Sequence, residues 1–188
     1  MNTVSARENL LFEMTPAQRA LTIVIGNLLL ILSAKIQIPF WPVPMTMQTM
    51  VVLLLGAFLG AKGAAAAVAL YLFEGGLGAP VFAGSPERGV GLAYMQGPTA
   101  GYLYGFLVAA LVVGWLAERG WTASFWKTVA AMTLGHVLIF IAGVAWLASL
   151  IGTQNAIAAG LTPFWAATAA KTAMAVAIVY AAARYRRA

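Results

Sequence analysis

Residues 37–48 read QIPFWPVPMTMQ, and this stretch decides how the chain on either side of it folds. It contains three prolines together with the large aromatic residues Phe40 and Trp41. Proline lacks an N–H group and restricts the residue before it, so a helix cannot continue through the stretch. The stretch carries no charge and is too apolar for a solvated linker. We therefore expect a rigid, partly buried connection that enters the membrane and helps to cover a cavity.

The composition is that of an integral membrane protein. Of the 188 residues, 62% are hydrophobic and 9% are charged, whereas soluble domains carry about 25% charged residues. The length suits a single domain. The chain has no cysteine, which excludes disulfides, thiol nucleophiles and thiolate metal sites. The net charge of +6 does not indicate a nucleic-acid partner, because the basic residues stand at the ends of apolar segments, where membrane topology explains them.

The apolar segments predict an all-α integral membrane fold with six transmembrane helices. The first begins at Thr15-Pro16-Ala17-Gln18, which combines a capping threonine, a proline at the first helical position and a glutamine that closes a capping box. About twenty residues cross a hydrocarbon core of about 30 Å. The second and third helices are shorter, with a tight turn between them. The predicted helices cover residues 15–35, 46–60, 62–73, 98–117, 125–150 and 162–183.

The domain organisation predicted from these segments is a single six-helix membrane domain between two short tails. Residues 1–14 form a cytoplasmic N-terminal tail that lacks the features of a signal peptide, residues 15–184 form the membrane domain, and residues 185–188 form a basic C-terminal tail. Six crossings put both termini on one side, and the positive-inside rule makes that side the cytoplasm. That side collects Arg7, Arg19, Lys62, Arg119, Lys127, Arg184, Arg186 and Arg187.

Three long connections of low charge then fall on the outer face: residues 37–48, 74–97 and 151–161. The second is rich in glycine but keeps Val81, Phe82 and Tyr94, so we expect an ordered cap rather than a disordered loop. Three apolar outer connections on one face suggest a lidded pocket that opens outward.

Lys171 is the polar residue that most needs a functional reason. It lies about eight residues inside the last helix, and a lysine at such depth is costly and by default functional. Thr168 stands three residues earlier and shares its face. Glu74, at the end of the third helix, is a possible partner for Lys171; the alternative is an interfacial carboxylate that faces water. For Lys171 and Thr168 the alternatives are a structural pair and a hydroxyl bonded to its own helix.

Other polar and aromatic residues leave two interpretations open. Gln48, beside the proline stretch, is a candidate ligand contact, but buried amides also hold membrane helices together. That structural interpretation is favoured for Asn27, and an interhelical hydrogen bond is favoured for His136, the single histidine. Trp41 and Tyr94 could stack on a ligand, although aromatics near membrane interfaces usually form a belt.

Three motifs together resemble the BioY family of biotin transporters. They are PVPMTMQ at residues 42–48, LGAPVFAG at 77–84 and GPTAGYLYGF at 97–106, in this order and spacing. The resemblance covers essentially the whole chain. It implies a multi-pass protein of the bacterial inner membrane that captures biotin from outside as the substrate-binding component of an energy-coupling factor transporter. Its partners would be a transmembrane coupling protein and two cytoplasmic ATPases, which some members are proposed to dispense with.

The resemblance also implies site residues. In the family's last helix an aspartate, followed three residues later by a lysine, contacts the ureido end of biotin. Lys171 matches this lysine, whereas Thr168 occupies the aspartate position and accepts hydrogen bonds more weakly than a carboxylate. Gln48 would add a polar contact. The apolar walls would come from Trp41, Phe82 and Tyr94.

Three other classes of function remain to be weighed. An intramembrane enzyme is not expected, because the chain has one histidine, no cysteine and no aspartate. A structural membrane protein would not need Lys171 at mid-depth. A transporter for another small vitamin is the nearest alternative, because Thr168 replaces the expected acid. No cofactor or metal is expected.

Overall fold

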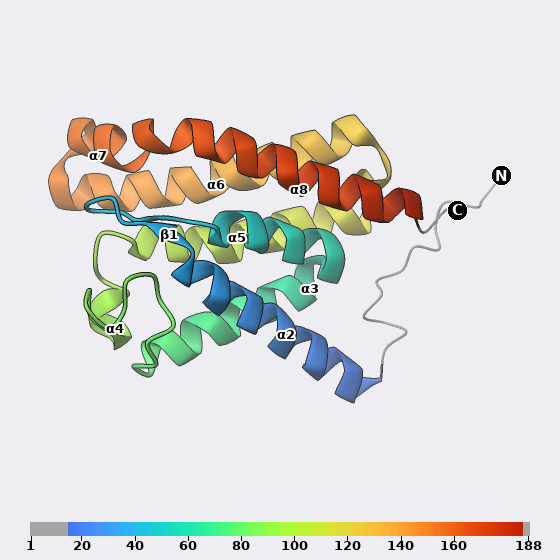
Figure 1. Cartoon of the computed structure of the whole chain (residues 1–188), viewed down its shortest axis with the longest axis horizontal. Helices are drawn as coiled ribbons and strands as arrows, with labels where there is room; N and C mark the ends of the chain where they lie inside the picture. The colour runs from blue at the N-terminus through green and yellow to red at the C-terminus, as the bar shows by residue number, and fades with distance from the viewer. Residues whose placement is uncertain (1–14, 186–188) are drawn as a thin grey trace.

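The computed structural model describes residues 15–185, so the predicted tail 1–14 and the basic residues at 186–188 lie outside the described residues. The described chain is almost entirely helical (Figure 1). Its elements are α2 (Pro16–Lys35), β1 (Gln37–Ile38), β2 (Met45–Thr46), α3 (Gln48–Gly76), α4 (Gly91–Tyr94), α5 (Ala100–Glu118), the 3₁₀ turn η1 (Trp121–Ala123), α6 (Phe125–Ile151), α7 (Thr153–Gly160), η2 (Thr162–Phe164) and α8 (Trp165–Tyr185).

Five segments of the described chain are long and apolar enough to cross a membrane, which confirms a mostly helical, multi-pass fold. They are α2, α3, α5, α6 and the run of α7, η2 and α8. The count differs from the predicted six because the predicted helices 46–60 and 62–73 follow each other without a loop and are counted as one element of 29 residues, α3.

The predicted turn inside α3 is nevertheless present as a break at one residue. Gly60 has φ 70° and ψ −178°, a left-handed backbone that favours glycine. The helix changes direction there and returns along the bundle (Figure 1). Glu118, at the end of α5, accepts a hydrogen bond at 2.8 Å from the backbone N–H of Ala61, an N–H group at the start of the second half. The second half continues to Gly76 rather than ending at Phe73, so Glu74 is helical.

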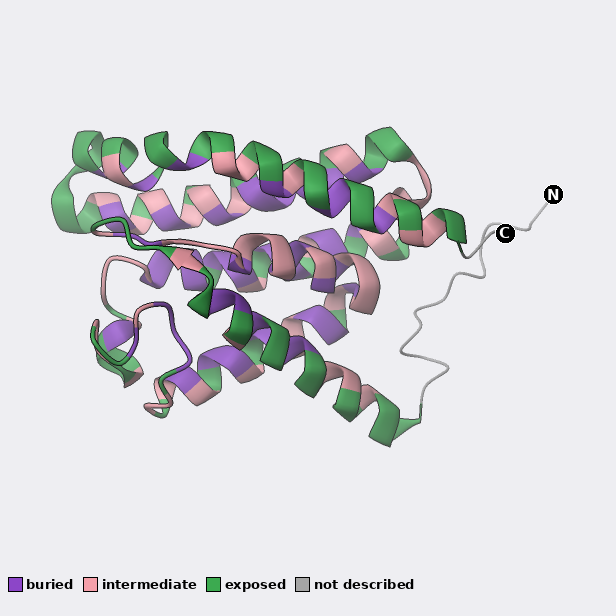
Figure 2. Cartoon of the chain, viewed as in Figure 1, coloured by how far each residue is buried: buried purple, intermediate pink, exposed green. Residues whose placement is uncertain are grey.

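The core lies where α3 and α5 pack together, with α2 on one side and α6 followed by α8 on the other. Buried residues face the interior of this bundle, and exposed residues cover the outer faces of α2 and α8 (Figure 2). The predicted capping box opens α2: Thr15 accepts from the Gln18 N–H at 3.3 Å, and the Gln18 side chain accepts from the Thr15 N–H at 2.8 Å. Many of the exposed residues on these outer faces are apolar, so the faces are suited to contact with lipid.

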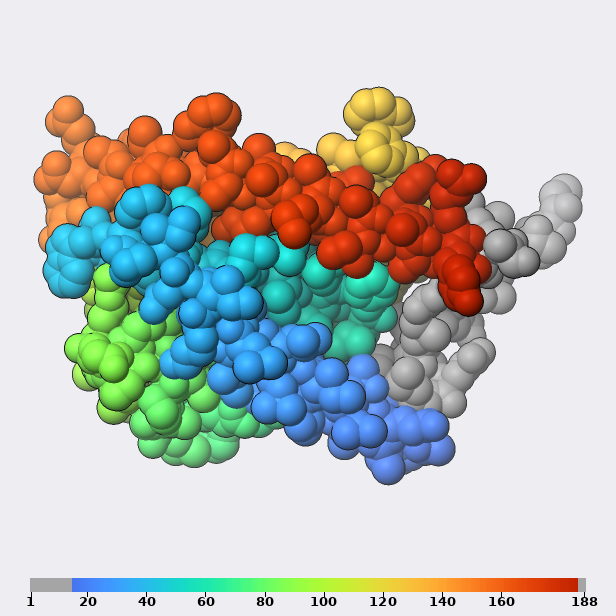
Figure 3. Space-filling model, in the orientation of Figure 1, coloured from blue at the N-terminus to red at the C-terminus, as the bar shows by residue number. Residues whose placement is uncertain are grey.

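The proline stretch and the glycine-rich connection both lie at one end of the bundle. Strands β1 and β2 pair antiparallel, with Gln37 opposite Thr46, and fold the proline stretch into a narrow hairpin. These short strands were not predicted. In the space-filling view this hairpin lies on the surface between α7–α8 and residues 77–95 (Figure 3).

The connection from Leu77 to Thr99 is ordered around one aromatic ring, as predicted for the cap. Phe82 is fully buried, stacks on Tyr94 with ring centroids 4.7 Å apart, and meets Tyr71 edge-on at 5.4 Å. The ring can approach α3 closely because residue 75 is glycine: a Cβ there would collide with the Phe82 ring. The cap therefore packs directly against the last turn of α3, because Gly75 has no side chain.

This close approach gives a prediction with a control at the adjacent residue. Gly75→Ala should lower stability by about 1–3 kcal/mol, because the added methyl group overpacks the Phe82 site. Gly76→Ala should be neutral or slightly stabilising, because its Cβ would meet Met95 at 3.4 Å and Leu92 at 3.7 Å, which are ordinary contacts, and alanine favours a helix. Thermal unfolding of both variants in detergent measures the difference. Equal midpoints for the two variants would contradict the packing described here.

Candidate functional site

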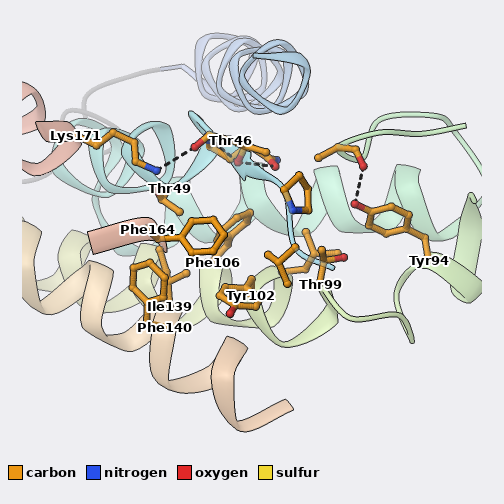
Figure 4. Close-up of a pocket in the computed structure, with 15 residues that line it drawn as sticks. Thr46, Thr49, Tyr94, Thr99, Tyr102, Phe106, Ile139, Phe140, Phe164 and Lys171 are labelled. Atoms are coloured by element: carbon orange, nitrogen blue, oxygen red, sulfur yellow. Dashed lines mark hydrogen bonds between the residues drawn. The ribbon is translucent and has the colours of Figure 1, made fainter. Parts of the chain in front are cut away.

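A cavity lies beneath the hairpin and the cap, at the end of the bundle where these connections meet (Figure 4). The space between its side chains amounts to about 520 Å³ including the open mouth, and to about 50 Å³ where the centre of a water-sized sphere fits. Most of the walls are apolar or aromatic, with a few polar groups among them. The lining residues are Val43, Pro44, Thr46, Gln48, Thr49, Ala83, Tyr94, Thr99, Tyr102, Leu103, Phe106, Ile139, Phe140, Phe164 and Lys171.

Lys171 brings a cation to this cavity from the second turn of α8. The residue is only 6% exposed, and its Nζ donates to the Thr46 carbonyl at 3.1 Å (Figure 4). An ammonium has three donors, and this is its one hydrogen-bond partner among the described residues. A cation at this depth is costly unless oxygen atoms surround it. Lys171 therefore offers a ligand a strong, incompletely satisfied donor.

Gln48 connects the cavity to the cap. Its Nε2 donates to the Tyr71 hydroxyl at 2.8 Å, and that hydroxyl lies 3.4 Å from the Val81 carbonyl, to which it donates. Gln48 is 2% exposed. Its amide nitrogen is thus engaged with the protein, while its Oε1 has a long contact of 3.4 Å with the Thr46 hydroxyl. The arrangement agrees with both sequence interpretations, because Gln48 joins segments and also lines the cavity.

A second chain of hydrogen bonds joins three helices behind the cavity wall. The His136 ring on α6 has Nε2 at 3.3 Å from the Thr49 hydroxyl on α3 and Nδ1 at 3.0 Å from the Thr172 hydroxyl on α8. The predicted interhelical hydrogen bond of His136 is confirmed. Thr49 was not singled out in the sequence, because a threonine near a helix start has no pattern that separates it from a capping or back-bonding residue.

Two cations fasten the cap, one to the end of α2 and the other to the hairpin. Lys35, at the end of α2, donates to the carbonyls of Pro80 at 2.7 Å and Phe82 at 3.0 Å, and to both oxygens of Ser85 at 3.3 Å. Arg88, in the cap, donates back to the hairpin, to the Phe40 carbonyl at 3.0 Å and less closely to Pro42 at 3.4 Å.

Three of the seven predicted site residues line the cavity: Lys171, Gln48 and Tyr94. The Tyr94 hydroxyl donates to the Ala83 carbonyl at 2.7 Å, so it closes the cap and presents its ring. Burial raises the pKa of this hydroxyl, which keeps its proton on the oxygen for that hydrogen bond.

The other four predicted residues do not line it. Glu74 accepts from the Asn27 amide at 3.0 and 3.1 Å on α2, because two polar groups in an apolar bundle satisfy each other. Phe82 lies behind Tyr94 as the centre of the cap. Trp41 is 79% exposed and carries the Arg88 guanidinium 5.5 Å above its ring.

Thr168 faces a different space, a wide apolar groove between α6 and α8. On the measure that gives about 50 Å³ for the cavity, the groove amounts to about 610 Å³. His136, Phe140 and Thr172 line this groove with it, and Phe140 also lines the cavity. The Thr168 hydroxyl is buried and has no hydrogen-bond partner in the described chain. The spacing of three residues therefore does not bring Thr168 and Lys171 to one site.

The cavity combines a cation, a hydroxyl and an amide oxygen with aromatic walls. Such a site suits a small ligand that has a compact polar edge and an apolar body. The polar edge would meet Lys171, because the ammonium is the strongest donor present.

Comparison with known proteins places this architecture in one family. The family model described as "BioY family" matches residues 5–188. The "Biotin transporter BioY" of Thermotoga maritima is 39% identical over 137 residues, 72% of this chain and 78% of that protein. The "Probable biotin transporter BioY" of Pyrococcus horikoshii is 35% identical over 147 residues, 77% of this chain and 83% of that protein.

A solved structure gives the same result for the fold. A crystal structure described as the S-component for biotin from an ECF-type ABC transporter superposes with a TM-score of 0.75 and 26% sequence identity, over 93% of this chain and 95% of that one. On the family model, the relatives and this fold, the chain belongs to the BioY family.

Proposed function

We propose that this protein takes up biotin, as the membrane component that captures it for transport. The observation that carries the proposal is the buried Lys171 ammonium at the inner end of a largely apolar cavity. The names of the relatives in Thermotoga and Pyrococcus and the description of the similar crystal structure support biotin as the ligand. The family membership is that of a transporter and not of an enzyme.

The chemistry of biotin matches the cavity group by group. Its ureido ring has a polar edge, with one carbonyl between two N–H groups, its thioether ring is apolar, and its valerate tail ends in a carboxylate. In the proposal the ureido carbonyl accepts from Lys171, and the rings lie against Tyr94, Phe106 and Phe164. A few fixed polar groups in an apolar pocket give orientation and specificity. The tail then points to the mouth, on the side of the hairpin and the cap.

The bilayer topology in this proposal has six crossings, with the two halves of α3 on either side of Gly60 counted separately. The start of α2 and the end of α8, each with a basic residue nearby, then lie in the cytoplasm. The hairpin, the cap and α7 face outward. This arrangement is supported by the start of α2 and the end of α8, which both lie at the opposite end of the bundle from the hairpin and α4 (Figure 1). The proposed location is the bacterial inner membrane.

The proposed partners are a transmembrane coupling protein and two cytoplasmic ATPases. Biotin captured from outside must be released inside, and that step requires a large rearrangement of the bundle. The described chain has no nucleotide-binding motif of its own that could drive it. Hydrolysis of ATP by the partner module would supply the free energy.

The hairpin and the cap form the lid in this proposal. The space of about 50 Å³ that a water-sized sphere reaches is far below the several hundred Å³ of ordinary ligand pockets. Biotin therefore enters only if these two connections part. The bonds that must loosen are those of Lys35, which joins the cap to the end of α2, and those of Arg88, which joins the cap to the hairpin.

Calorimetric titration of biotin into the detergent-purified protein tests the function. We expect selective binding, with thiamine as a ligand that does not bind. Lys171→Met should weaken biotin at least about tenfold, because a charge-assisted hydrogen bond is lost while the stem is kept. Thr168→Val, on the same helix, should stay within about twofold, because Thr168 faces the groove.

No binding of biotin by the folded protein would refute the function and direct the search to other small vitamins. Equal losses for the Lys171 and Thr168 variants would place the ligand elsewhere.

The lid can be tested through rates of ligand exchange. Arg88→Met should speed biotin dissociation about fivefold, because it removes two hydrogen bonds from cap to hairpin at a partly exposed site. Glu87→Gln, at the neighbouring exposed residue, is the matched control and should not change the rate. Stopped-flow exchange with a fluorescent biotin measures both. An unchanged rate for Arg88→Met would mean that the cap does not gate the cavity.

The topology can be tested by labelling, because the chain contains no cysteine. Single cysteines at three exposed positions, Lys62→Cys, Glu87→Cys and Gln154→Cys, are treated with a maleimide that does not cross membranes. In intact cells the variants at 87 and 154 should react, and the variant at 62 should react only after permeabilisation. Reaction at position 62 in intact cells would rule out six crossings with cytoplasmic termini.

A further inference from the structure

The position of one proton can be deduced from the hydrogen bonds around His136. The Thr172 hydroxyl donates to the Thr168 carbonyl at 2.8 Å, one turn earlier in α8. The same hydroxyl lies 3.0 Å from His136 Nδ1. A hydroxyl has a single proton. We assign this proton to the shorter bond, the one to the backbone; on that assignment Thr172 accepts at His136, and Nδ1 carries the hydrogen.

The other ring nitrogen is therefore an acceptor. His136 is 2% exposed, and Thr172, its partner, follows Lys171 directly in α8. An imidazolium here would add a second cation to an apolar interior, which is costly. In the neutral ring with hydrogen on Nδ1, the Nε2 atom has a lone pair. The Thr49 hydroxyl, 3.3 Å away, donates its proton to that lone pair.

The Thr49 hydroxyl then has only lone pairs left for a ligand in the cavity that Thr49 lines. Its single proton points back to His136, while its side chain lines the cavity beside Thr46 and Lys171 (Figure 4). A threonine on a surface rotates its hydroxyl to suit either a donor or an acceptor. At this position the ring behind it fixes the choice. The inner end of the cavity thus has a fixed donor, Lys171, and a fixed acceptor, Thr49.

This pair is complementary to a cyclic urea, which has a carbonyl oxygen flanked by N–H groups. We propose that Thr49 is a ligand-binding residue that accepts a hydrogen bond from one ureido N–H, and that His136 is the positioning residue that makes Thr49 an acceptor; this inference rests on the proposed function. Thr49 then takes the part of the acceptor that Thr168 cannot play, since Thr168 faces the groove.

The experiment compares ligands that differ by one donor. Biotin is titrated alongside its two cyclic carbamate analogues, in which one or the other ureido N–H is replaced by oxygen without added bulk. The wild-type protein should bind one analogue about tenfold more weakly than biotin, because an oxygen then faces the Thr49 lone pairs. Desthiobiotin keeps both N–H groups and is the control ligand.

Variants of Thr49 should remove this discrimination. Thr49→Val should lower the affinity for biotin and for desthiobiotin about tenfold each, while the discriminated analogue then binds within about threefold of biotin. Thr49→Ser keeps the hydroxyl and should retain the wild-type pattern. Where Thr49→Val does not purify as a folded protein, Thr49→Ala serves for the same comparison. A purely structural role of Thr49 would change all ligands equally and leave the ratio intact.

Two variants of His136 separate its two ring nitrogens. A glutamine amide reaches the place of Nε2, so His136→Gln keeps an acceptor for Thr49 and should keep the discrimination between biotin and the analogue. An asparagine amide reaches only the place of Nδ1, so His136→Asn keeps the Thr172 contact and should lose the discrimination. Melting midpoints of the two variants control for packing.

The outcomes distinguish this inference from the function on which it rests. Failure of the wild-type protein to bind biotin would overturn both. Binding of biotin by the wild type, with the same ratio of biotin to analogue affinity in Thr49→Val, would overturn the role of Thr49 and leave the function standing. Equal behaviour of His136→Gln and His136→Asn would overturn the role of His136.

Discussion

A lysine ammonium inside an apolar bundle must be met by oxygen atoms, and this requirement shapes the structure around Lys171. Its Nζ is held by the Thr46 carbonyl, which the β1–β2 hairpin leaves free for it at the entrance to α3. In a helix that carbonyl would accept from the N–H of residue 50, but α3 begins only at Gln48, so Thr46 lies outside it. The hairpin, the start of α3 and the second turn of α8 are thereby brought to one point, and the cavity forms where they meet.

Two cations, and not apolar packing alone, hold the cap against the end of α2 and against the hairpin. The ammonium at the end of α2 binds cap carbonyls, and the guanidinium of the cap binds hairpin carbonyls. Carbonyls in irregular segments have no helical partner, so each cation satisfies groups that would otherwise be orphaned. Phe82 fills the space beneath, between Tyr71 and Tyr94. This combination gives ordered connections that can still separate, because their charged bonds lie near water.

The long helices, the ordered cap and the burial of Lys171 could be predicted from the sequence, because each depends on local pattern: apolar runs, prolines, and one charge within an apolar helix. The short helix α7 was missed and lies in residues 151–161, which were predicted as a connection. The site could be predicted only in part, because its walls come from segments far apart in the chain. Residues three apart on a helix point about 60° from each other, and this angle separates Thr168, in the groove, from Lys171, in the cavity. Glu74 and Asn27 were judged separately, yet they bind each other. Thr49 gave no signal at all, because only the ring behind it distinguishes it.

Phe140 lines both the cavity and the groove between α6 and α8, so a single layer of side chains separates the two spaces. On the groove side that layer, with Trp165 71% exposed beside it, meets whatever acyl chains surround the protein. The side chains of this wall therefore contact the cavity on one face and the lipid acyl chains on the other. Lateral pressure and acyl-chain order, which differ between a micelle and a bilayer, act directly on how firmly that wall is held.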